Sequence, residues 1–192
     1  MGETGKGCGR KMGCERERRA GLVSFLCPRS WRPSVGHIDV RELKRRGIDG
    51  LIVDVDNTLV EWDRHEPTDA LKSWFSAAND AGLRCCVVSN SRRRARIAGF
   101  AAALGVPFIA PAGKPLPWCF RSAMRVLGTD PRRTAVVGDQ VFTDVLGGNA
   151  LGLYTILVPP KCPREFVGTR LVRRLERLVL GYLRRRGYIE GA

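Results

Sequence analysis

Short apolar runs alternate with amphipathic stretches along the chain from about residue 38 onward. Five runs have the length and the aliphatic content of buried strands: 50–55, 84–89, 106–110, 134–138 and 153–158. The first stretch between them repeats apolar residues at the spacing of one helical face: Leu71, Trp74, Phe75 and Ala78. The pattern therefore predicts strands separated by helices.

Turn and cap residues mark the ends of these helices. Thr68 or Asp69 is suited to begin the first, and Gly82 to end it. We expect a second helix from Ser91 to Gly105, a third from Pro115 to Gly128 and a short one over 143–150. Strict alternation of strand and helix is typical of parallel strands joined by right-handed crossovers. The predicted fold class is α/β, a doubly wound parallel sheet with helices on both faces.

The composition limits the size and class of the protein. A chain of 192 residues and 21.2 kDa is long enough for one well-buried domain. Hydrophobic residues make up 44% and charged residues 27%, which excludes a largely disordered or collagen-like chain. No apolar run approaches the roughly 20 residues that a membrane-spanning helix needs.

The ends of the chain differ in composition from its middle. Residues 1–20 are rich in Gly and Arg with little apolar content, which is typical of a disordered basic tail. We expect residues 21–160 to form the folded domain and 161–192 to form a basic amphipathic C-terminal helix, packed on the domain or on a membrane surface. The seven cysteines are odd in number and contain no C-x-x-C pair, so we expect reduced thiols in a cytoplasmic protein.

The positive charge is concentrated near the C-terminus. Overall, 33 − 19 gives +14, and residues 161–192 hold nine basic and three acidic groups. Over 169–186 one stripe is apolar, while arginines occupy much of the remaining surface. This pattern fits a helix on an anionic membrane surface, a terminal helix packed on the sheet, or both. Nucleic acid is a second candidate for an anionic partner, although no nucleic-acid motif is present.

Polar side chains occur where the predicted strands end. In a doubly wound sheet, ligands bind beyond the carboxyl ends of the strands. The residues at these positions are Asp54, Asp56, Ser89, Asn90, Lys114, Asp139 and, at the start of the next helix, Asp144. Any one of them alone could cap a turn or lie in solvent. Neighbouring carboxylates repel and favour a divalent cation, and a lysine and a hydroxyl suit a phosphoryl group. Together they predict a phosphoryl-transfer centre.

Four segments in this order resemble the motifs of the haloacid dehalogenase superfamily of phosphatases. They are Asp54-Val55-Asp56-Asn57-Thr58-Leu59-Val60, Ser89-Asn90, Lys114-Pro115 and Gly138-Asp139-Gln140-Val141-Phe142-Thr143-Asp144. Gly47-Ile48-Asp49-Gly50 and Gly147-Gly148-Asn149 are similar to one branch, subfamily IIIA. That branch holds the YqeG-type phosphatases, which are related to mitochondrial phosphatidylglycerophosphate phosphatases.

The resemblance implies a role for each motif residue. Asp54 is the expected nucleophile and a ligand of Mg²⁺, and Asp56 the expected general acid and base, with its backbone carbonyl on the metal. Asp139 and Asp144 complete or support the metal site. Thr58 is expected to support the first loop. The residues expected to bind phosphate are Thr58, Ser89, Asn90 and Lys114.

The spacing of the motifs leaves no room for a cap domain. Only seven residues, 61–67, separate the first motif from the next helix, and 23 separate Asn90 from Lys114. An uncapped site needs help to exclude water, so we expect a macromolecular or membrane-embedded phosphomonoester. By resemblance the best candidate is phosphatidylglycerophosphate, with peripheral contact to the inner face of a membrane. A soluble or protein phosphoester and a nucleic-acid-binding module on the same scaffold are the alternatives, and the sequence leaves the oligomeric state open.

Overall fold

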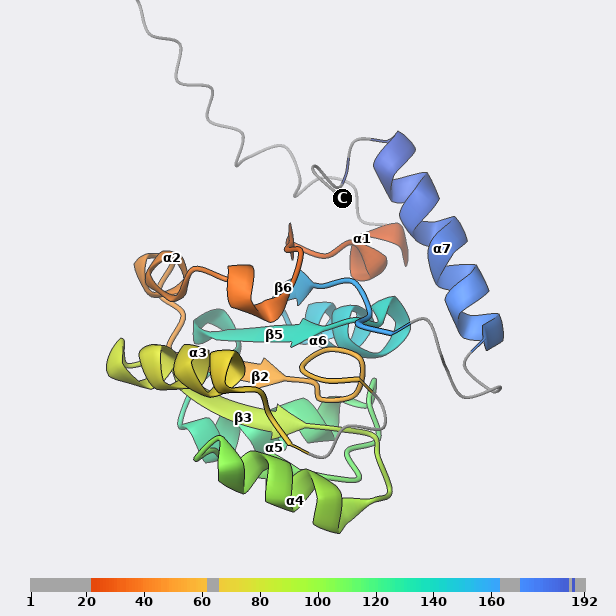
Figure 1. Ribbon diagram of the computed structural model, residues 1–192. Helices are drawn as coiled ribbons and strands as arrows, with labels where there is room; N and C mark the ends of the chain where they lie inside the picture. Colours follow the sequence, from red (N-terminus) through yellow and green to blue (C-terminus); the bar gives the residue numbers. More distant parts are fainter. Residues whose placement is uncertain (1–21, 62–65, 163–169, 187, 189–192) are drawn as a thin grey trace, which may run out of the picture.

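The computed structural model describes residues 22–61, 66–162, 170–186 and 188 (Figure 1). The predicted tail at 1–20 lies outside the described residues. The core is a six-stranded sheet in the order β1-β6-β5-β2-β3-β4, and every pairing is parallel. The strands are β1 (Ser30–Trp31), β2 (Gly50–Val53), β3 (Arg84–Val88), β4 (Phe108–Ile109), β5 (Thr134–Gly138) and β6 (Tyr154–Leu157). The predicted doubly wound α/β fold is confirmed.

Helices cover both faces of the sheet because successive strand residues point to opposite sides. Leu51 and Val53 of β2 pack in one core, with α2 (Val40–Arg45), α3 (Asp69–Asp80) and α4 (Arg94–Ala103). Ile52 packs in the other, with α5 (Pro117–Leu127). The short helices α1 (Leu22–Leu26) and α6 (Leu146–Ala150) contact each other, and α6 contacts α5. There are also three short turns in this part of the chain: η2 (Val35–His37), η3 (Pro131–Arg133) and the π-helical η4 (Val141–Val145).

Two predicted helices begin later than expected. The second starts at Arg94 rather than Ser91, because the hydroxyl of Ser89 accepts a hydrogen bond from Ser91 N and holds that residue in the loop. The third starts at Pro117 rather than Pro115, because Leu116 N donates to Gly113 O and closes a turn first. Both corrections lengthen the loops at the sheet edge, and the second places the motif residue Pro115 in a loop rather than in a helix.

The last predicted short helix is divided into two parts. The expected range was 143–150. In the structure the π-helical turn η4 begins before this range and extends to Val145, and only α6, which follows it, has regular α-helical geometry. Such turns are frequent at functional sites, because they shift the side chains away from the regular helical spacing. Here the turn contains Asp144, whose carboxyl group points back toward the end of β5.

The chain reverses its direction of travel across the sheet between β2 and β5. From β2 it proceeds outward to β3 and β4, then crosses back to β5 and β6 on the other side. Val53 pairs with Val137, and Asp54 N donates to Val137 O at 3.0 Å, so the ends of these two strands lie side by side. The topology therefore brings Asp54 and Asp139 to one switch point, where such folds bind ligands.

The described part of the chain contains no cap domain over this edge. The segment between β3 and α5 holds only α4 and β4. A C-terminal helix, α7 (Arg170–Arg185), lies beyond the strand ends at the side of the molecule (Figure 1). None of the described helices combines the length and the apolar character that crossing a bilayer requires.

Candidate active site

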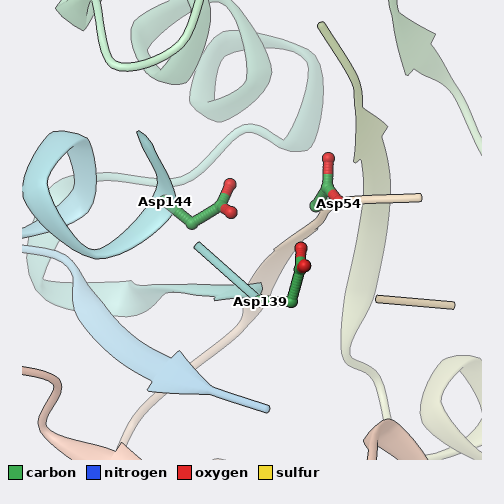
Figure 2. A group of neighbouring side chains, drawn as sticks. All are labelled: Asp54, Asp139 and Asp144. Atoms are coloured by element: carbon green, nitrogen blue, oxygen red, sulfur yellow. The ribbon is translucent and has the colours of Figure 1, made fainter. Parts of the chain in front are cut away.

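Three buried carboxylates meet at the carboxyl ends of β2 and β5. Asp54 follows β2, Asp139 follows β5 and Asp144 comes from η4, and one oxygen of each lies within 4.8 Å of the others (Figure 2). Gly138 makes this approach feasible, because a Cβ at that position would lie 2.1 Å from Asp144 Cγ. The three side chains can therefore act on one small ligand together.

The three carboxylates are unfavourable together without a cation. Burial, with the nearby Asp54 carboxylate, raises the pKa of Asp139 and the pKa of Asp144 above the ordinary carboxyl range. A divalent cation with hard oxygen ligands fits this set, because it compensates the repulsion directly. The Asn57 amide oxygen is also buried at the cleft, and no described residue donates a hydrogen bond to it. The donor set thus fits a divalent metal ion.

Lys114 is the cation that the protein supplies to Asp54 and Asp144 of this cluster. Its Nζ lies 2.5 Å from Asp54 Oδ1 and 2.8 Å from Asp144 Oδ1, and the side chain is buried. Burial alone lowers the pKa of Lys114, but the Asp144 and Asp54 carboxylates outweigh it and raise the pKa above its ordinary value. Lys114 is therefore a permanent positive charge beside the predicted nucleophile.

Asn90 fixes the backbone of Lys114. Its Oδ1 accepts from Lys114 N at 2.7 Å, and its Nδ2 donates to Lys114 O at 3.0 Å. Two hydrogen bonds to the backbone of one residue, one on each side of its Cα, specify the path of the loop after β4. This places Asn90 in the role of positioning Lys114, in addition to its place in the cleft wall.

Asp56 has a separate environment from the three-carboxylate cluster. Its Oδ2 accepts from Ser89 Oγ at 3.3 Å, and its Oδ1 accepts from the Arg96 guanidinium. Burial raises the pKa of Asp56, and the Asp54 charge adds to this effect while Arg96 opposes it. A carboxyl group with a raised pKa, two positions after the predicted nucleophile Asp54, is suited to give a proton and take it back.

The loop after β2 has a fixed backbone conformation, which determines where its side chains lie. Asn57 has a left-handed backbone with φ of 63°, a conformation that Asn tolerates better than most residues. Asn57 N donates to Val60 O at 2.8 Å and closes the loop. Thr58, which the resemblance associated with phosphate, donates its hydroxyl to Asp139 Oδ1 at 2.9 Å. This hydrogen bond orients the Asp139 carboxylate, and a role for Thr58 in phosphate binding stays a prediction.

The cleft over these residues has a volume of about 500 Å³ and a strongly basic wall. Besides the motif residues, its lining contains four arginines: Arg92, Arg93, Arg96 and Arg173. Arginine binds phosphate oxygens through several N–H groups at once. The wall and the cluster together favour an anionic ligand whose phosphoryl group lies beside Asp54.

Comparison with known proteins agrees with this arrangement. The model of the family described as haloacid dehalogenase-like hydrolases matches residues 34–152. "Probable phosphatase YqeG" of Bacillus subtilis is 41% identical over 169 residues, which cover 88% of this chain and 98% of that protein. The chain belongs to the haloacid dehalogenase-like hydrolases. The family and the relative show that it is a phosphatase.

Two further relatives of this haloacid dehalogenase-like phosphatase are more distant. The chloroplastic phosphatidylglycerophosphate phosphatase 1 of Chlamydomonas reinhardtii is 30% identical over 165 residues, 81% of this chain and 61% of that protein. The chloroplastic/mitochondrial enzyme of the same name from Arabidopsis thaliana is 28% identical over 177 residues, 85% of this chain and 49% of that protein. The chain thus spans about half to three fifths of these two relatives.

The predicted site residues gather at one edge of the sheet, as expected from the motifs. Asp54, Asp139 and Asp144 form the cluster, and Lys114 joins two of them. The carboxyl group of Asp56 points to Ser89 and Arg96 and takes no part in the cluster. The backbone carbonyl of Asp56, which the resemblance gives to the metal, stays a prediction.

Two arginines beside this haloacid dehalogenase-like site were missed at the sequence level. Arg96 of α4 has a side chain only 5% exposed and pairs with Asp56. Arg173 of α7 donates to Asp139 O at 2.7 Å and also pairs with the Asp139 carboxylate. Both belong to arginine-rich helical segments, and no local signal distinguishes them from the exposed arginines beside them.

Proposed function

We propose that this phosphatase is a Mg²⁺-dependent phosphomonoesterase that works through an aspartyl-phosphate intermediate on Asp54. Its best candidate substrate is phosphatidylglycerophosphate, taken at a membrane surface. The observation that carries the proposal is the buried cluster of Asp54, Asp139 and Asp144, with Lys114 bridging two of its members.

The metal site and the phosphate site would share Asp54. Asp54, Asp139 and Asp144 would hold the Mg²⁺ ion, which when bound would neutralise the carboxylates and polarise the phosphoryl oxygens. Lys114 and the Ser89 hydroxyl would bind the remaining phosphoryl oxygens, and Asn90 would hold the lysine in place. Lys114 and the Ser89 hydroxyl would then stabilise the negative charge that develops on the phosphoryl oxygens, in a buried site and without rearrangement.

The chain's own carboxyl groups account for both halves of the reaction. An oxygen of Asp54 attacks phosphorus, the bond from phosphorus to the ester oxygen breaks, and Asp56 gives its proton to that leaving oxygen. Asp56, now ionised, takes a proton from a water molecule that attacks the phosphoryl group on Asp54. The bond between phosphorus and Asp54 breaks, and inorganic phosphate and the free carboxylate are restored.

Three observations support a lipid substrate. The two distant relatives are named as phosphatidylglycerophosphate phosphatases. The described chain has no cap over the cleft, so a small substrate would not be enclosed. The arginines in the cleft wall suit a molecule with anionic groups besides the phosphate that is removed.

A substrate screen with purified protein tests the proposal. We would compare phosphatidylglycerophosphate in mixed micelles with sugar phosphates, nucleotides and a phosphopeptide, each with Mg²⁺ and with a chelator. Because contacts remote from the reacting phosphate raise kcat/KM for the true substrate, we expect the lipid to exceed the others by about 100-fold. The Asp54→Asn variant is the control for contaminating phosphatases. A preference for nucleotides or sugar phosphates would refute the lipid substrate.

The alternatives are distinguished by the same screen. If the substrate is a soluble or protein phosphoester, that compound would give the highest kcat/KM in the screen. The dependence on metal would be unchanged, since only the leaving group differs. A nucleic-acid-binding module would bind RNA with steep salt dependence. The family and the buried metal-type cluster favour catalysis over that interpretation.

A further inference from the structure

The helix α7 presents two different faces. The inner face holds the helix on the domain: Leu183 is fully buried, and Val179 and Leu180 pack on Val141 and Val145 of η4. Glu176 is also buried, and its carboxylate accepts from Phe142 N at 3.2 Å. Because these contacts fix the rotation of the helix, they also fix which side chains face outward.

The outward face combines exposed apolar side chains with arginines. Leu175, Leu178 and Tyr182 lie along one stripe and are 48%, 64% and 43% exposed. The exposed arginines of the helix and of the residue after it are Arg174, Arg177, Arg184, Arg185 and Arg186. The one acidic residue of α7 is the buried Glu176. The outer face of α7, defined by these eight residues, is therefore apolar in its centre and wholly cationic around it.

We infer that the outer face of α7 docks on an anionic lipid bilayer, which presents the lipid phosphate to the uncapped cleft. This inference rests on the proposed function for the identity of the substrate, but the docking itself does not require turnover. A helix with an apolar stripe flanked by Arg or Lys inserts its stripe at the headgroup boundary, while the cations contact anionic headgroups.

The helix α7 lies close to the cleft, so a bilayer bound to it would be near the site. Figure 1 shows α7 beyond the ends toward which the strand arrows point, which is the edge that carries the cleft. Arg173 on the same helix lines the cleft and contacts Asp139. A surface bound by the outer face of α7 is therefore next to the site and not behind the sheet.

A second exposed apolar pair lies at the same edge. Leu116 and Trp118, 54% and 49% exposed, flank the first residue of α5 and follow Lys114 closely in the chain. Exposed tryptophan is typical of membrane–water interfaces, where one end of the ring is apolar and the other is wet. The pair provides a second contact for the bilayer beside the cleft.

Vesicle sedimentation of the full chain tests the inference. Vesicles of phosphatidylcholine alone are compared with vesicles that also contain phosphatidylglycerol, at about 0.1 M salt, where exposed charges are still felt over about 10 Å. We expect binding to the anionic vesicles only. Since each cation near an anionic surface contributes about fivefold to partitioning, replacing Arg174, Arg177 and Arg184 by Gln should lower it by about 100-fold.

A matched variant separates location from net charge. Arg41, Arg125 and Arg132 are exposed and lie away from α7, on α2, near the end of α5 and in η3. Replacing them by Gln gives the same formal charge, 14 − 3 = +11, and should leave vesicle binding within about twofold. The apolar variant Leu175→Ser/Leu178→Ser/Tyr182→Ser should lose binding while hydrolysis of soluble p-nitrophenyl phosphate is retained, which shows that the fold is intact.

The outcomes distinguish this inference from the proposed function. Vesicle binding by native protein and by Asp54→Asn, with no hydrolysis of the lipid by either, would support the docking and refute the substrate. Equal loss of binding in the α7 and control arginine variants would overturn the inference. So would a concentration-dependent dimer that the apolar variant abolishes, because the stripe would then be covered by a second copy of the chain.

Discussion

Replacing Arg96 by Gln should make the phosphatase sensitive to the leaving group of its substrate. Arg96 pairs with Asp56, the predicted general acid, whose carboxyl group has one other described hydrogen bond, from Ser89 Oγ at 3.3 Å. An alkyl phosphate needs a proton on its leaving oxygen, whereas nitrophenolate leaves readily as an anion. A displaced Asp56 should therefore slow the first substrate much more than the second.

The expected loss of kcat/KM in Arg96→Gln is estimated from how much general-acid catalysis depends on the placement of the Asp56 carboxyl group. A well-placed acid contributes about 10²–10⁴-fold, and Ser89 retains part of that placement in the variant. We expect kcat/KM for an alkyl phosphate to fall by about 100-fold, or about 2.7 kcal/mol in the barrier. The value for p-nitrophenyl phosphate should stay within about threefold, since the acid contributes little to it. The ratio kcat/KM is the correct measure, because it excludes the later step in which Asp56 acts as a base.

The loss of the ion pair also affects folding, and the assay must allow for it. Removing one partner of a fully buried pair costs about 3–5 kcal/mol. The Arg96 side chain is 5% exposed but that of Asp56 is 20% exposed, so solvent can stabilise the remaining carboxylate. We expect a loss of about 1–3 kcal/mol in the free energy of unfolding, which denaturant titration measures.

Arg94→Gln is the matched control for this prediction. Arg94 is on the same helix, donates to Ala110 O at 2.5 Å and stacks on Phe108, away from Asp56. Its variant should change both substrates equally, Arg96→Lys should be intermediate, and Asp56→Asn should give the upper limit of the leaving-group effect. An equal fall for both substrates in Arg96→Gln would show that Arg96 binds the phosphoryl group or supports the fold, and would refute the positioning role.

Three further predictions concern the carboxylate cluster. Asp54→Asn should abolish hydrolysis with little change in Tm, because it removes one partner of Lys114 but also relieves repulsion with Asp139 and Asp144; measurable turnover in this variant would exclude Asp54 as the nucleophile. Burial and the Asp54 charge raise the pKa of Asp139 and of Asp144, and a raised carboxyl pKa gives stability that is lost as the pH rises through it. The Tm of the metal-free protein should therefore be lower at about pH 8 than at about pH 5, and Mg²⁺ should raise it more at pH 8; a pH-independent effect of Mg²⁺ on calorimetric Tm would contradict this. Gly138→Ala should destabilise by about 1–3 kcal/mol and weaken Mg²⁺ binding in a calorimetric titration, because its Cβ would lie 2.1 Å from Asp144 Cγ. Gly99→Ala, whose Cβ meets no atom within 4 Å in the interior of α4, should instead be neutral or stabilising by about 0.5–1 kcal/mol.

The sequence was informative wherever chemistry and periodicity are local. Apart from the exposed Arg84, every residue of β2, β3 and β5 is buried, and most are apolar, so their pattern predicted these strands and the motif residues after them. The edge strand β1 was not predicted, because two residues, Ser30 and Trp31, carry no periodicity and pair only through the tertiary fold. The later starts of α4 and α5 depend on loop hydrogen bonds such as Leu116 N to Gly113 O, which no helix propensity encodes.

The arginines beside the site show a more general limit of prediction from the sequence. The motifs specify the carboxylates, which repel one another, and one compensating cation, Lys114. The other two cations that hold these carboxylates, Arg96 and Arg173, come from helices whose sequences signal only charge and amphipathicity. A buried guanidinium is stable only where a carboxylate already stands, so its position is set by the assembled site and not by its neighbours in the chain. For that reason the charges that balance a catalytic centre are harder to find in a sequence than the charges that define it, and in this phosphatase they connect the centre to α4 and to α7.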